Sequence, residues 1–296
     1  MKRRRFSRRL TVVACAAFAA GVGWWWCAGR GVSAAARGGQ AGVDGGQTGK
    51  VPVLVELFTS EGCSSCPPAD ALLGRLDREQ PLRNAQIIVL SEHVDYWNNG
   101  GWQDRFSSVE LTQRQKDYGE FFKLDDVYTP QMVVNGAAQV NGADGKAIAA
   151  ALEKAADSHP VPLHIASVQV HGKVVTFRLQ SGMPATPGDV NVYAALVDPE
   201  DTTKVGGGEN HGRTLQHTGV VRVLDRVSSS RTQDIGGKPF VLKGSVSGRS
   251  GLDGMRLVVF AQKKQIGPVV GADECLIAGT AKAESGPVGP CPSAGS

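Results

Sequence analysis

Residues 56–70 read ELFTSEGCSSCPPAD, and this stretch decides the predicted fold. It begins inside an apolar, β-rich run that starts at residue 51, and it leads into a segment whose leucines recur at helical spacing. Between the two lies the pair Cys63-Ser64-Ser65-Cys66. The order predicts a strand, a Cys-x-x-Cys motif and a helix that begins at the motif.

The position of the two cysteines matters for thiol chemistry. The N-terminus of a helix has free backbone N–H groups, which stabilise a thiolate. Two intervening residues leave Cys66 close enough to Cys63 to resolve a mixed disulfide. Because Pro67 and Pro68 follow at once, the helix is expected to begin at Pro67, which weakens the activation of Cys63. Taken alone, the motif also fits half of a zinc site or a structural disulfide.

The patterns on the two sides of residue 158 differ. Before it, strands are predicted at 51–59, 86–91, 132–134 and 140–142, and helices at 69–78, 109–122 and 145–156. This order predicts an α/β domain with a central mixed sheet flanked by helices. After it, apolar runs at 163–170, 173–180, 190–197, 220–227, 239–243 and 255–262 predict a small antiparallel β-sandwich domain.

Composition divides the chain into five predicted segments. They are a signal peptide or membrane anchor at 1–37, a Gly/Gln-rich flexible linker at 38–50, the α/β domain at 51–158, the β-sandwich domain at 159–278, and a loose C-terminal tail at 279–296.

The first segment has the order of a secretory signal. Residues 1–9 hold six basic residues and no acidic one, residues 10–28 are uncharged and largely apolar, and small residues follow. This order predicts export, to the periplasm or to the outside of the cell. The apolar run has 19 residues, close to the ~20 that span a bilayer as a helix. A membrane tether through residues 10–28 is therefore the alternative to cleavage.

The charge of the remaining chain excludes nucleic acid as a main partner. The whole chain has a net charge of +4, but residues 1–37 carry eight basic residues and no acidic one, so taking +8 from +4 leaves −4. A mildly acidic protein without a basic stripe lacks the electrostatic footprint of a nucleic-acid binder.

Four of the six cysteines lie beyond the signal segment. In an oxidising compartment an even number favours pairing, and the simplest pairing is local: Cys63 with Cys66, and Cys275 with Cys291. The second pair is expected to be structural. Apart from a redox-active disulfide between the first two, we expect no cofactor.

The context of the motif resembles the thioredoxin superfamily. A strand leads to the cysteine pair at a helix start, and Thr129-Pro130 later enters a strand that ends in Asn135-Gly136. By this resemblance, Pro130 is expected to have a cis peptide bond and to shape a substrate groove. The Thr129 backbone is expected to meet a peptide partner in that groove.

Residues 56–70 also look like the signature of one exported family, domain of unknown function 1223, to which a thioredoxin-like fold is assigned. The same pattern is fitted by HVDYW at 93–97, GW at 101–102, RQ at 114–115, YTPQ at 128–131 and the stretch from GEN at 208–210 to Leu215. The resemblance covers roughly residues 51–280. It implies a thioredoxin-like first domain and a redox pair, but it implies no substrate.

Further candidates lie around the pair. Glu56 lies in the strand before the motif. If it is buried, we expect it to take the proton of the resolving cysteine. The alternative is that Glu56 is exposed to solvent at a strand edge. His93 is either hydrogen-bonded within its loop or a metal ligand that completes a soft set with Cys63 and Cys66. Trp97 and Trp102 either pack the loop or form a wall of the substrate groove.

A dense polar group stands in the second half of the chain. It comprises residues 209–213, which read ENHGR, and His217. A structured loop that lies against the first domain is the favoured interpretation, and a metal or ligand site is the alternative.

We therefore expect an exported thiol–disulfide oxidoreductase-like protein that acts on the thiols or disulfides of other exported proteins. Cys63 exchanges with the partner, Cys66 resolves the mixed disulfide, Pro130 shapes the contact surface and Glu56 moves the proton. Two alternatives stay open. One is a copper- or other metal-binding protein that uses both cysteines and His93; the other is a non-catalytic interaction module with a structural disulfide.

Overall fold

The computed structural model describes residues 49–181, 189–231, 235, 238–244, 246–264, 266–277, 289 and 291–292. The expected signal segment, nearly all of the expected linker and most of the expected C-terminal tail lie outside these ranges. Within them, no helix is both long enough and apolar enough to span a membrane. The elements described below belong to one compact unit, residues 47–296.

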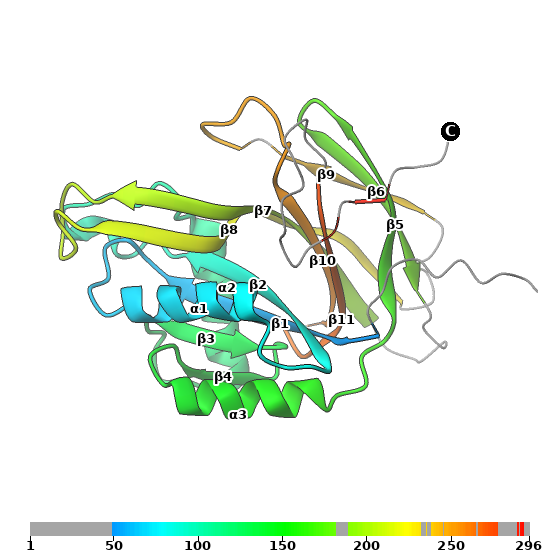
Figure 1. The fold of residues 1–296 in the computed structure, drawn as a ribbon, viewed down its shortest axis with the longest axis horizontal. Helices are drawn as coiled ribbons and strands as arrows, with labels where there is room; N and C mark the ends of the chain where they lie inside the picture. The colour runs from blue at the N-terminus through cyan, green and yellow to red at the C-terminus, as the bar shows by residue number, and fades with distance from the viewer. Residues whose placement is uncertain are drawn as a thin grey trace, which may run out of the picture. The chain divides into compact units, whose positions relative to one another are not determined.

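A large mixed sheet has its eight strands in the order β11-β10-β7-β8-β2-β1-β3-β4 (Figure 1). The strands are β1 Val51–Thr59, β2 Ala85–His93, β3 Gln131–Val134, β4 Ala138–Asn141, β7 Asp189–Lys204, β8 Thr214–Arg231, β10 Arg256–Lys263 and β11 Val269–Leu276. β1 lies inside the sheet, parallel to β2 and antiparallel to β3. From Val53 onward β1 is wholly buried, as expected of an apolar strand that is covered on both faces.

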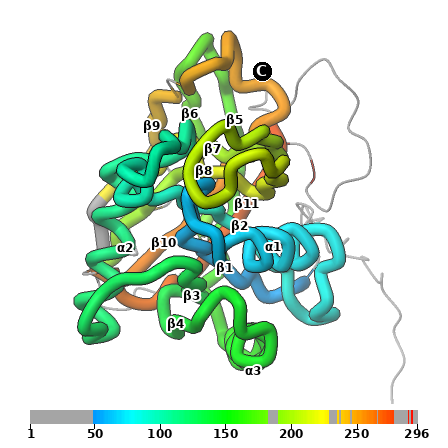
Figure 2. Tube along the Cα trace, turned by 90° about the vertical axis from the view of Figure 1, so that its left-hand side faces the viewer, coloured from blue at the N-terminus to red at the C-terminus, as the bar shows by residue number. Residues whose placement is uncertain are grey.

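The helices in the described ranges are α1 Pro67–Glu79, α2 Val109–Phe122 and α3 Gly145–Ala156, with a short 3₁₀ helix η1 at Asn98–Gly100. α1 and α3 cover one face of β1, where Leu73 and Ile148 share a core with Val55. α2 covers the other face, where Tyr118 packs with Phe58. Figure 2 shows α1 and α2 on opposite sides of β1. Alternate residues of β1 thus face two separate cores.

Local side chains set where the helices begin. The Ser108 hydroxyl accepts a hydrogen bond from Leu111 N at the start of α2, and the Asp144 carboxylate accepts one from Ala147 N at the start of α3. Cys66 precedes α1 without a side-chain cap, and prolines occupy the first two helical positions. Proline is tolerated there because the first N–H groups of a helix have no partner within the helix.

A smaller antiparallel sheet has the strand order β5-β6-β9, with β5 Leu163–His171, β6 Val174–Ser181 and β9 Pro239–Lys243. It packs on the part of the large sheet that β7, β10 and β11 form. Phe177 of β6 shares this core with Val192 of β7 and Val259 of β10.

The structure corrects the predicted fold class. We expected a helix-flanked α/β thioredoxin-like domain followed by a separate small antiparallel β-sandwich. Instead, β8 pairs in parallel with β2 at Ser91 and Val220, and strands from both sides of residue 158 form one mixed sheet. The described chain is mostly β, with three α-helices. The prediction was wrong because it gave the second half of the chain a sheet of its own.

Strand length explains this error. β7 and β8 have 16 and 18 residues and pair with each other along most of their length. The sequence predicted strands only at 190–197 and 220–227. The extensions at 198–204 and 214–219 read DPEDTTK and TLQHTG, which have no strand signal of their own. Cross-strand pairing holds them in the extended conformation. β11 was not predicted either.

The local elements before residue 158 are confirmed. β1, α2 and α3 have the predicted bounds, and the remaining four elements differ from them by a few residues at most. The order β-α-β-α-β-β-α is also as predicted. Local periodicity was therefore sufficient for the elements but not for the sheet that they join.

Gly219 marks the place where β8 approaches β2. Its φ is +69°, and a Cβ atom at this position would lie 2.7 Å from Val89 O. The backbone conformation and the lack of space both exclude an L side chain. The next residue, Val220, is the one that pairs with β2.

We expect Gly219→Ala to lower the free energy of unfolding by about 3 kcal/mol, with about 1 kcal/mol from the left-handed backbone and about 2 kcal/mol from the overlap with Val89. Gly172→Ala is the matched control, because Gly172 has φ +60° and nothing within 4 Å of its added Cβ. The control should lose only about 1 kcal/mol. Urea unfolding measures both. Equal losses would contradict the close approach of β8 to β2.

Candidate functional site

The loop between β1 and α1 holds the disulfide Cys63–Cys66, with an S–S distance of 2.12 Å and a Cα–Cα distance of 5.5 Å. Both cysteines are 0% exposed. The two residues between them, Ser64 and Ser65, are exposed. The pair therefore lies just below the surface, under a thin exposed turn.

Two hydroxyl groups meet at one sulfur of the pair. The Thr129 hydroxyl donates a hydrogen bond to Cys63 Sγ at 3.3 Å, and Ser65 Oγ lies 3.4 Å from the same sulfur. Trp97 Nε1 donates to Thr129 Oγ1 at 2.8 Å and so orients the threonine hydroxyl. Trp97 thus stands behind Thr129 at the edge of the cysteine loop.

The Thr129–Pro130 peptide bond is cis, as the family resemblance implied. Pro130 is buried and lies against α1, since a Cβ added at Gly142 would meet both Pro130 Cβ, at 2.9 Å, and Ala69 Cβ, at 3.1 Å. The loop that carries Thr129 and the start of α1 are therefore held together next to the disulfide.

The tip of the β7–β8 hairpin, residues 205–213, binds the cysteine loop from the other side. The Asn210 side-chain amide, which is 0% exposed, donates to Glu61 O and to Cys63 O, both at 2.9 Å. Arg213 donates to Asn210 Oδ1 at 2.8 Å and fixes the orientation of the amide. Glu209 Oε2 accepts from Ser64 N at 3.2 Å. The dense polar group of the sequence is thus a structured hairpin tip packed on the cysteine loop.

Trp102 packs between the same two segments. Its Nε1 donates to Glu61 Oε2 at 2.7 Å, and a Cβ added at Gly206 or Gly208 would lie 3.0 or 3.2 Å from the Trp102 side chain. The glycines of the hairpin tip therefore leave room for this indole. Trp102 thus packs against both the hairpin tip and the cysteine loop.

A cluster of buried acids and histidines lies beneath the loop. His93 Nδ1 and Asp104 Oδ2 are 2.7 Å apart, and Asp104 also accepts from Glu61 N at 2.8 Å. His217 Nε2 is 3.5 Å from Glu61 Oε1, and its ring centroid is 4.9 Å from that of His93. Asp70, in the first turn of α1, is also buried and donates its backbone N–H to Cys66 O.

Three members of this cluster, Asp104, His93 and Asp70, have pKa values that their surroundings shift. Burial alone raises the pKa of Asp104, but the charge of His93 and hydrogen bonds from it and from the backbone lower the pKa to about 2. Burial alone lowers the pKa of His93, but Asp104 raises it above the usual value. Burial raises the pKa of Asp70, and the nearby histidines only partly offset this. Asp104 is therefore ionised at neutral pH.

The alternative metal set, Cys63, Cys66 and His93, includes two cysteines that are joined to each other by a disulfide in the structure. Among the described residues, no group of three or more His, Cys, Asp or Glu side chains has a geometry that holds a metal ion. His93 is fully buried, and its Nδ1 is bonded to Asp104. The structure therefore favours the interpretation of His93 as a histidine hydrogen-bonded within its loop.

Glu56 is buried in a different cluster. Arg114 Nε donates to Glu56 Oε1 and the Tyr118 hydroxyl donates to Glu56 Oε2, both at 2.6 Å. Burial raises the pKa of Tyr118 well above its ordinary value, and the charge of Glu56 adds to this effect. Because its carboxylate is engaged by Arg114 and Tyr118, a proton-moving role for Glu56 stays a prediction. The buried acid bonded to the cysteine loop through its backbone is Asp70.

The second predicted disulfide, Cys275–Cys291, is present, with a Cα–Cα distance of 4.7 Å. It ties the chain after β11 back to that strand, where Cys291 N also donates to Leu276 O. Closing a loop of 15 residues contributes about 3 kcal/mol in the chain-entropy model.

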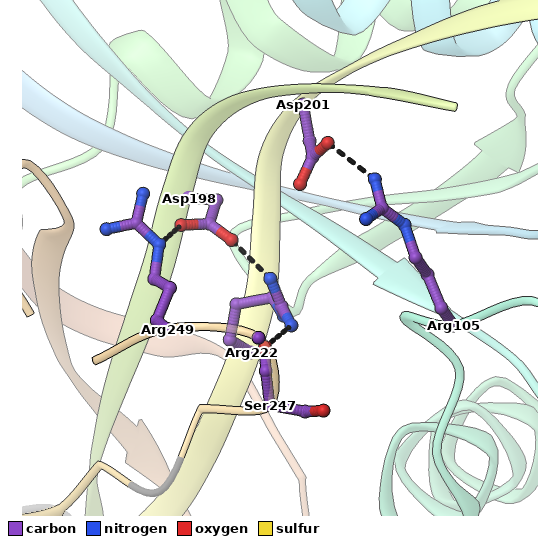
Figure 3. A pocket seen from close by; sticks show the side chains of 7 residues that line it. Arg105, Asp198, Asp201, Arg222, Ser247 and Arg249 are labelled. Carbon is purple, nitrogen blue, oxygen red and sulfur yellow. Dashed lines mark hydrogen bonds and ion pairs between the residues drawn. The ribbon is translucent and has the colours of Figure 1, made fainter. Parts of the chain in front are cut away.

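A polar cleft of about 260 Å³ lies elsewhere on the β7–β8 hairpin (Figure 3) and is lined by Arg105, Asp198, Asp201, Arg222, Ser247, Gly248 and Arg249. Its charges pair with one another: Asp198 accepts from Arg222 and forms an ion pair with Arg249, and Arg105 donates to Asp201. These ion pairs tie the hairpin to two neighbouring loops. We assign the cleft no chemistry, because its charged groups already have partners.

Residues 54–262 match the family model described as "Protein of unknown function (DUF1223)". The chain belongs to this family.

Two solved structures are similar to this DUF1223 protein. The crystal structure of a protein from Agrobacterium tumefaciens, a structural genomics target, has 28% sequence identity and a TM-score of 0.59, over 81% of this chain and 100% of that one. HBP35 of Porphyromonas gingivalis, with 13% identity, a TM-score of 0.52 and coverage of 80% and 79%, shows a likeness of fold alone. No curated protein matches the chain.

Sequence reasoning missed two features of the site in this DUF1223 protein. Asp70 was quoted only as part of the motif, although its position four residues after Cys66 places both on one side of a helix. Arg114 was quoted within the family pattern at 114–115, but its burial against Glu56 was not predicted. An acid inside an apolar strand is the signal that a buried partner of opposite charge is needed.

The Asp104 carboxylate makes stability depend on pH in the acid range. Its pKa is about 2 in the folded protein, below the ordinary 3.8, so its contribution is complete above pH 4 and is lost as the pH falls toward 2. The shift corresponds to about 2 kcal/mol. Asp104→Asn should therefore reduce the loss of stability between pH 4 and pH 2 by about 2 kcal/mol, as measured by urea unfolding. Asp253→Asn, at an exposed acid, is the control. If Asp104→Asn lost as much stability between pH 4 and pH 2 as the wild type, the lowered pKa of Asp104 would be refuted.

Proposed function

We propose that Cys63–Cys66 is a redox-active disulfide and that this protein exchanges disulfides with the thiols of other exported proteins. One observation carries the proposal: the hydroxyls of Thr129 and Ser65 both lie within 3.4 Å of Cys63 Sγ. Hydrogen bonds to the charged form of a group favour that form. The Thr129 hydroxyl donates to this sulfur, and Ser65 Oγ, which also donates to Thr129 O at 3.5 Å, lies beside it. A structural disulfide does not need a donor at one of its sulfurs, whereas a donor stabilises a reactive thiolate.

The contacts of the two sulfurs differ, and this assigns their roles. Among the described residues, two hydroxyl groups lie within hydrogen-bond distance of Cys63 Sγ, and none does so for Cys66 Sγ. Cys66 is at the N-cap of α1, where the helix favours negative charge. Cys63 is then the sulfur that exchanges with a partner, and Cys66 is the leaving and resolving sulfur.

The proposed reaction has two balanced steps. A partner thiolate attacks Cys63 Sγ, the S–S bond breaks, and its electron pair goes to Cys66, which takes up a proton. A second partner thiolate then attacks the partner's sulfur in the mixed disulfide and releases Cys63 as a thiolate. The partner has lost two electrons and the cysteine pair has gained them; the reverse sequence reduces a partner disulfide.

This chemistry requires movement around the pair, because neither sulfur is exposed. Ser64 and Ser65 form the exposed surface above them, and the hairpin tip binds the same turn through Glu209 and Asn210. Displacing this turn exposes Cys63. The same burial favours the second candidate function, an interaction module in which the disulfide is only structural.

Export is part of the proposal. It is supported by the order of basic, apolar and small residues in 1–37 and by two disulfides, which persist in oxidising compartments. The resemblance to the thioredoxin superfamily enters only locally, as a strand, a cysteine pair, a helix and a cis-proline with shared chemistry. It does not extend to the whole architecture.

Trapping with oxidised glutathione tests the assigned roles. Cys66→Ser leaves Cys63 free, and we expect it to form a stable mixed disulfide with glutathione because its thiolate is stabilised by hydroxyls. Cys63→Ser leaves Cys66, which should react about tenfold more slowly. Mass spectrometry of the intact protein gives both rates. A faster reaction of Cys66 would reverse the assignment, and no reaction of either variant would contradict the proposal.

The Thr129 hydroxyl can be removed without changing the volume of the side chain. In the Cys66→Ser background, Thr129→Val should slow alkylation of Cys63 by iodoacetamide at neutral pH by about tenfold, because the thiolate loses a charge-assisted hydrogen bond. Thr129→Ser retains the hydroxyl and should react at nearly the parent rate. Equal rates for the valine and serine variants would show that the hydroxyl does not act on Cys63.

A further inference from the structure

The tip of the β7–β8 hairpin places a negative charge at the cysteine pair. We propose that Glu209 tunes the reactivity of this pair: its carboxylate disfavours the Cys63 thiolate and so holds Cys63–Cys66 toward the disulfide. The inference rests on the proposed function, and it adds a residue that sets the balance between the oxidised and reduced forms.

The position of the carboxylate is well defined. Glu209 Oε2 accepts from Ser64 N, the amide that directly follows Cys63 in the chain. The neighbouring residue anchors it, because the buried Asn210 amide bonds to Cys63 O and Glu61 O. Glu209 and Ser64 are 145 residues apart in the sequence. The hairpin tip that carries Glu209 is itself hydrogen-bonded to the cysteine loop through Asn210.

Glu209 is also unneutralised in the described structure. Its side chain is exposed, and no ion pair with a lysine, arginine or histidine of the described residues involves it. The Ser64 hydroxyl and amide lower the pKa of Glu209, so the group is ionised at neutral pH. A full negative charge therefore remains at the Ser64 amide, the group that follows Cys63 in the chain.

Two effects of this charge act in the same direction. A like charge close to a thiolate destabilises it. In addition, Glu209 occupies the Ser64 N–H, which is then not available to a thiolate on Cys63. Since the disulfide carries no charge and the reduced pair carries the thiolate, both effects shift the equilibrium with glutathione toward the disulfide.

Charge and hydrogen bonding are separated by two substitutions. Glu209→Gln retains an acceptor for Ser64 N and removes the charge, whereas Glu209→Ala removes both. With reduced and oxidised glutathione as the probe, we expect the equilibrium constant to shift toward the dithiol by about threefold in the Gln variant, and by at least as much in the Ala variant. In the Cys66→Ser background, Glu209→Gln should speed alkylation of Cys63 below pH 8 by a similar factor.

The matched control is Glu200→Gln. Glu200 is an exposed acid on β7 of the same hairpin, and it lies 4.0 Å from Arg78, in the last turn of α1. The Arg78 guanidinium lies beside Gly74, since a Cβ added there would be 3.1 Å from Arg78 Nη1. Gly74 is eight residues after Cys66, so Glu200 is about 12 Å from Cys66 along the helix axis. Its removal changes the net charge equally and should leave the equilibrium unchanged.

The outcomes separate this inference from the function on which it rests. A shift in Glu209→Gln without a shift in Glu200→Gln supports it. Suppose that the wild-type pair exchanges with glutathione but that Glu209→Gln has the same equilibrium constant as the wild type, whether or not Glu209→Ala differs. The charge then has no role, and this inference fails while the proposed function stands. Equal shifts in both Gln variants also overturn it, since a general charge effect then explains them. If the wild-type pair does not exchange at all, the proposed function itself fails.

Discussion

The two hydrogen bonds of the Asn210 side chain connect the site to the fold. The loop from Glu61 to Cys63 has two buried carbonyl groups, and the Asn210 amide bonds both of them. Cys63 O also accepts from Cys66 N, whereas the Asn210 amide is the donor that the structure gives to Glu61 O. Leaving a buried carbonyl without a partner costs about 1–3 kcal/mol. The amide can reach these groups only because β7 and β8 continue far beyond their apolar segments. The long hairpin and the cysteine loop therefore define each other's position.

This dependence explains what the sequence predicted and what it did not. Periodicity located β1, α2 and α3, because each of them buries a face that its own residues define. The polar ends of β7 and β8 are strands only because they pair with each other, so no local pattern reveals them. The parallel contact of Val220 with β2 joins segments about 130 residues apart. For these reasons the predicted second domain does not exist as a separate sandwich.

The candidate site likewise combines features that local sequence reveals with features that depend on contacts between distant segments. The cysteine pair and the polar loop at 209–213 were found from local patterns in the sequence. The cis-proline was expected only from the resemblance to the thioredoxin superfamily. The partners of Glu56 and the burial of Asp70 depend on packing between elements, and a periodicity argument cannot supply them. The asymmetry between the two sulfurs, with hydroxyl groups at Cys63 and a helix N-terminus at Cys66, likewise arises from segments that the fold brings together. The proposed disulfide exchange rests on this asymmetry and not on the motif alone.

The most direct test of the account is a glutathione redox titration of the wild-type protein, with the Cys63–Cys66 state followed by thiol alkylation. Cys275–Cys291 provides an internal structural disulfide for comparison. The account predicts a midpoint for Cys63–Cys66 in the range of exchanging pairs, roughly −270 to −120 mV. A midpoint below about −300 mV, indistinguishable from that of a structural disulfide, would contradict it.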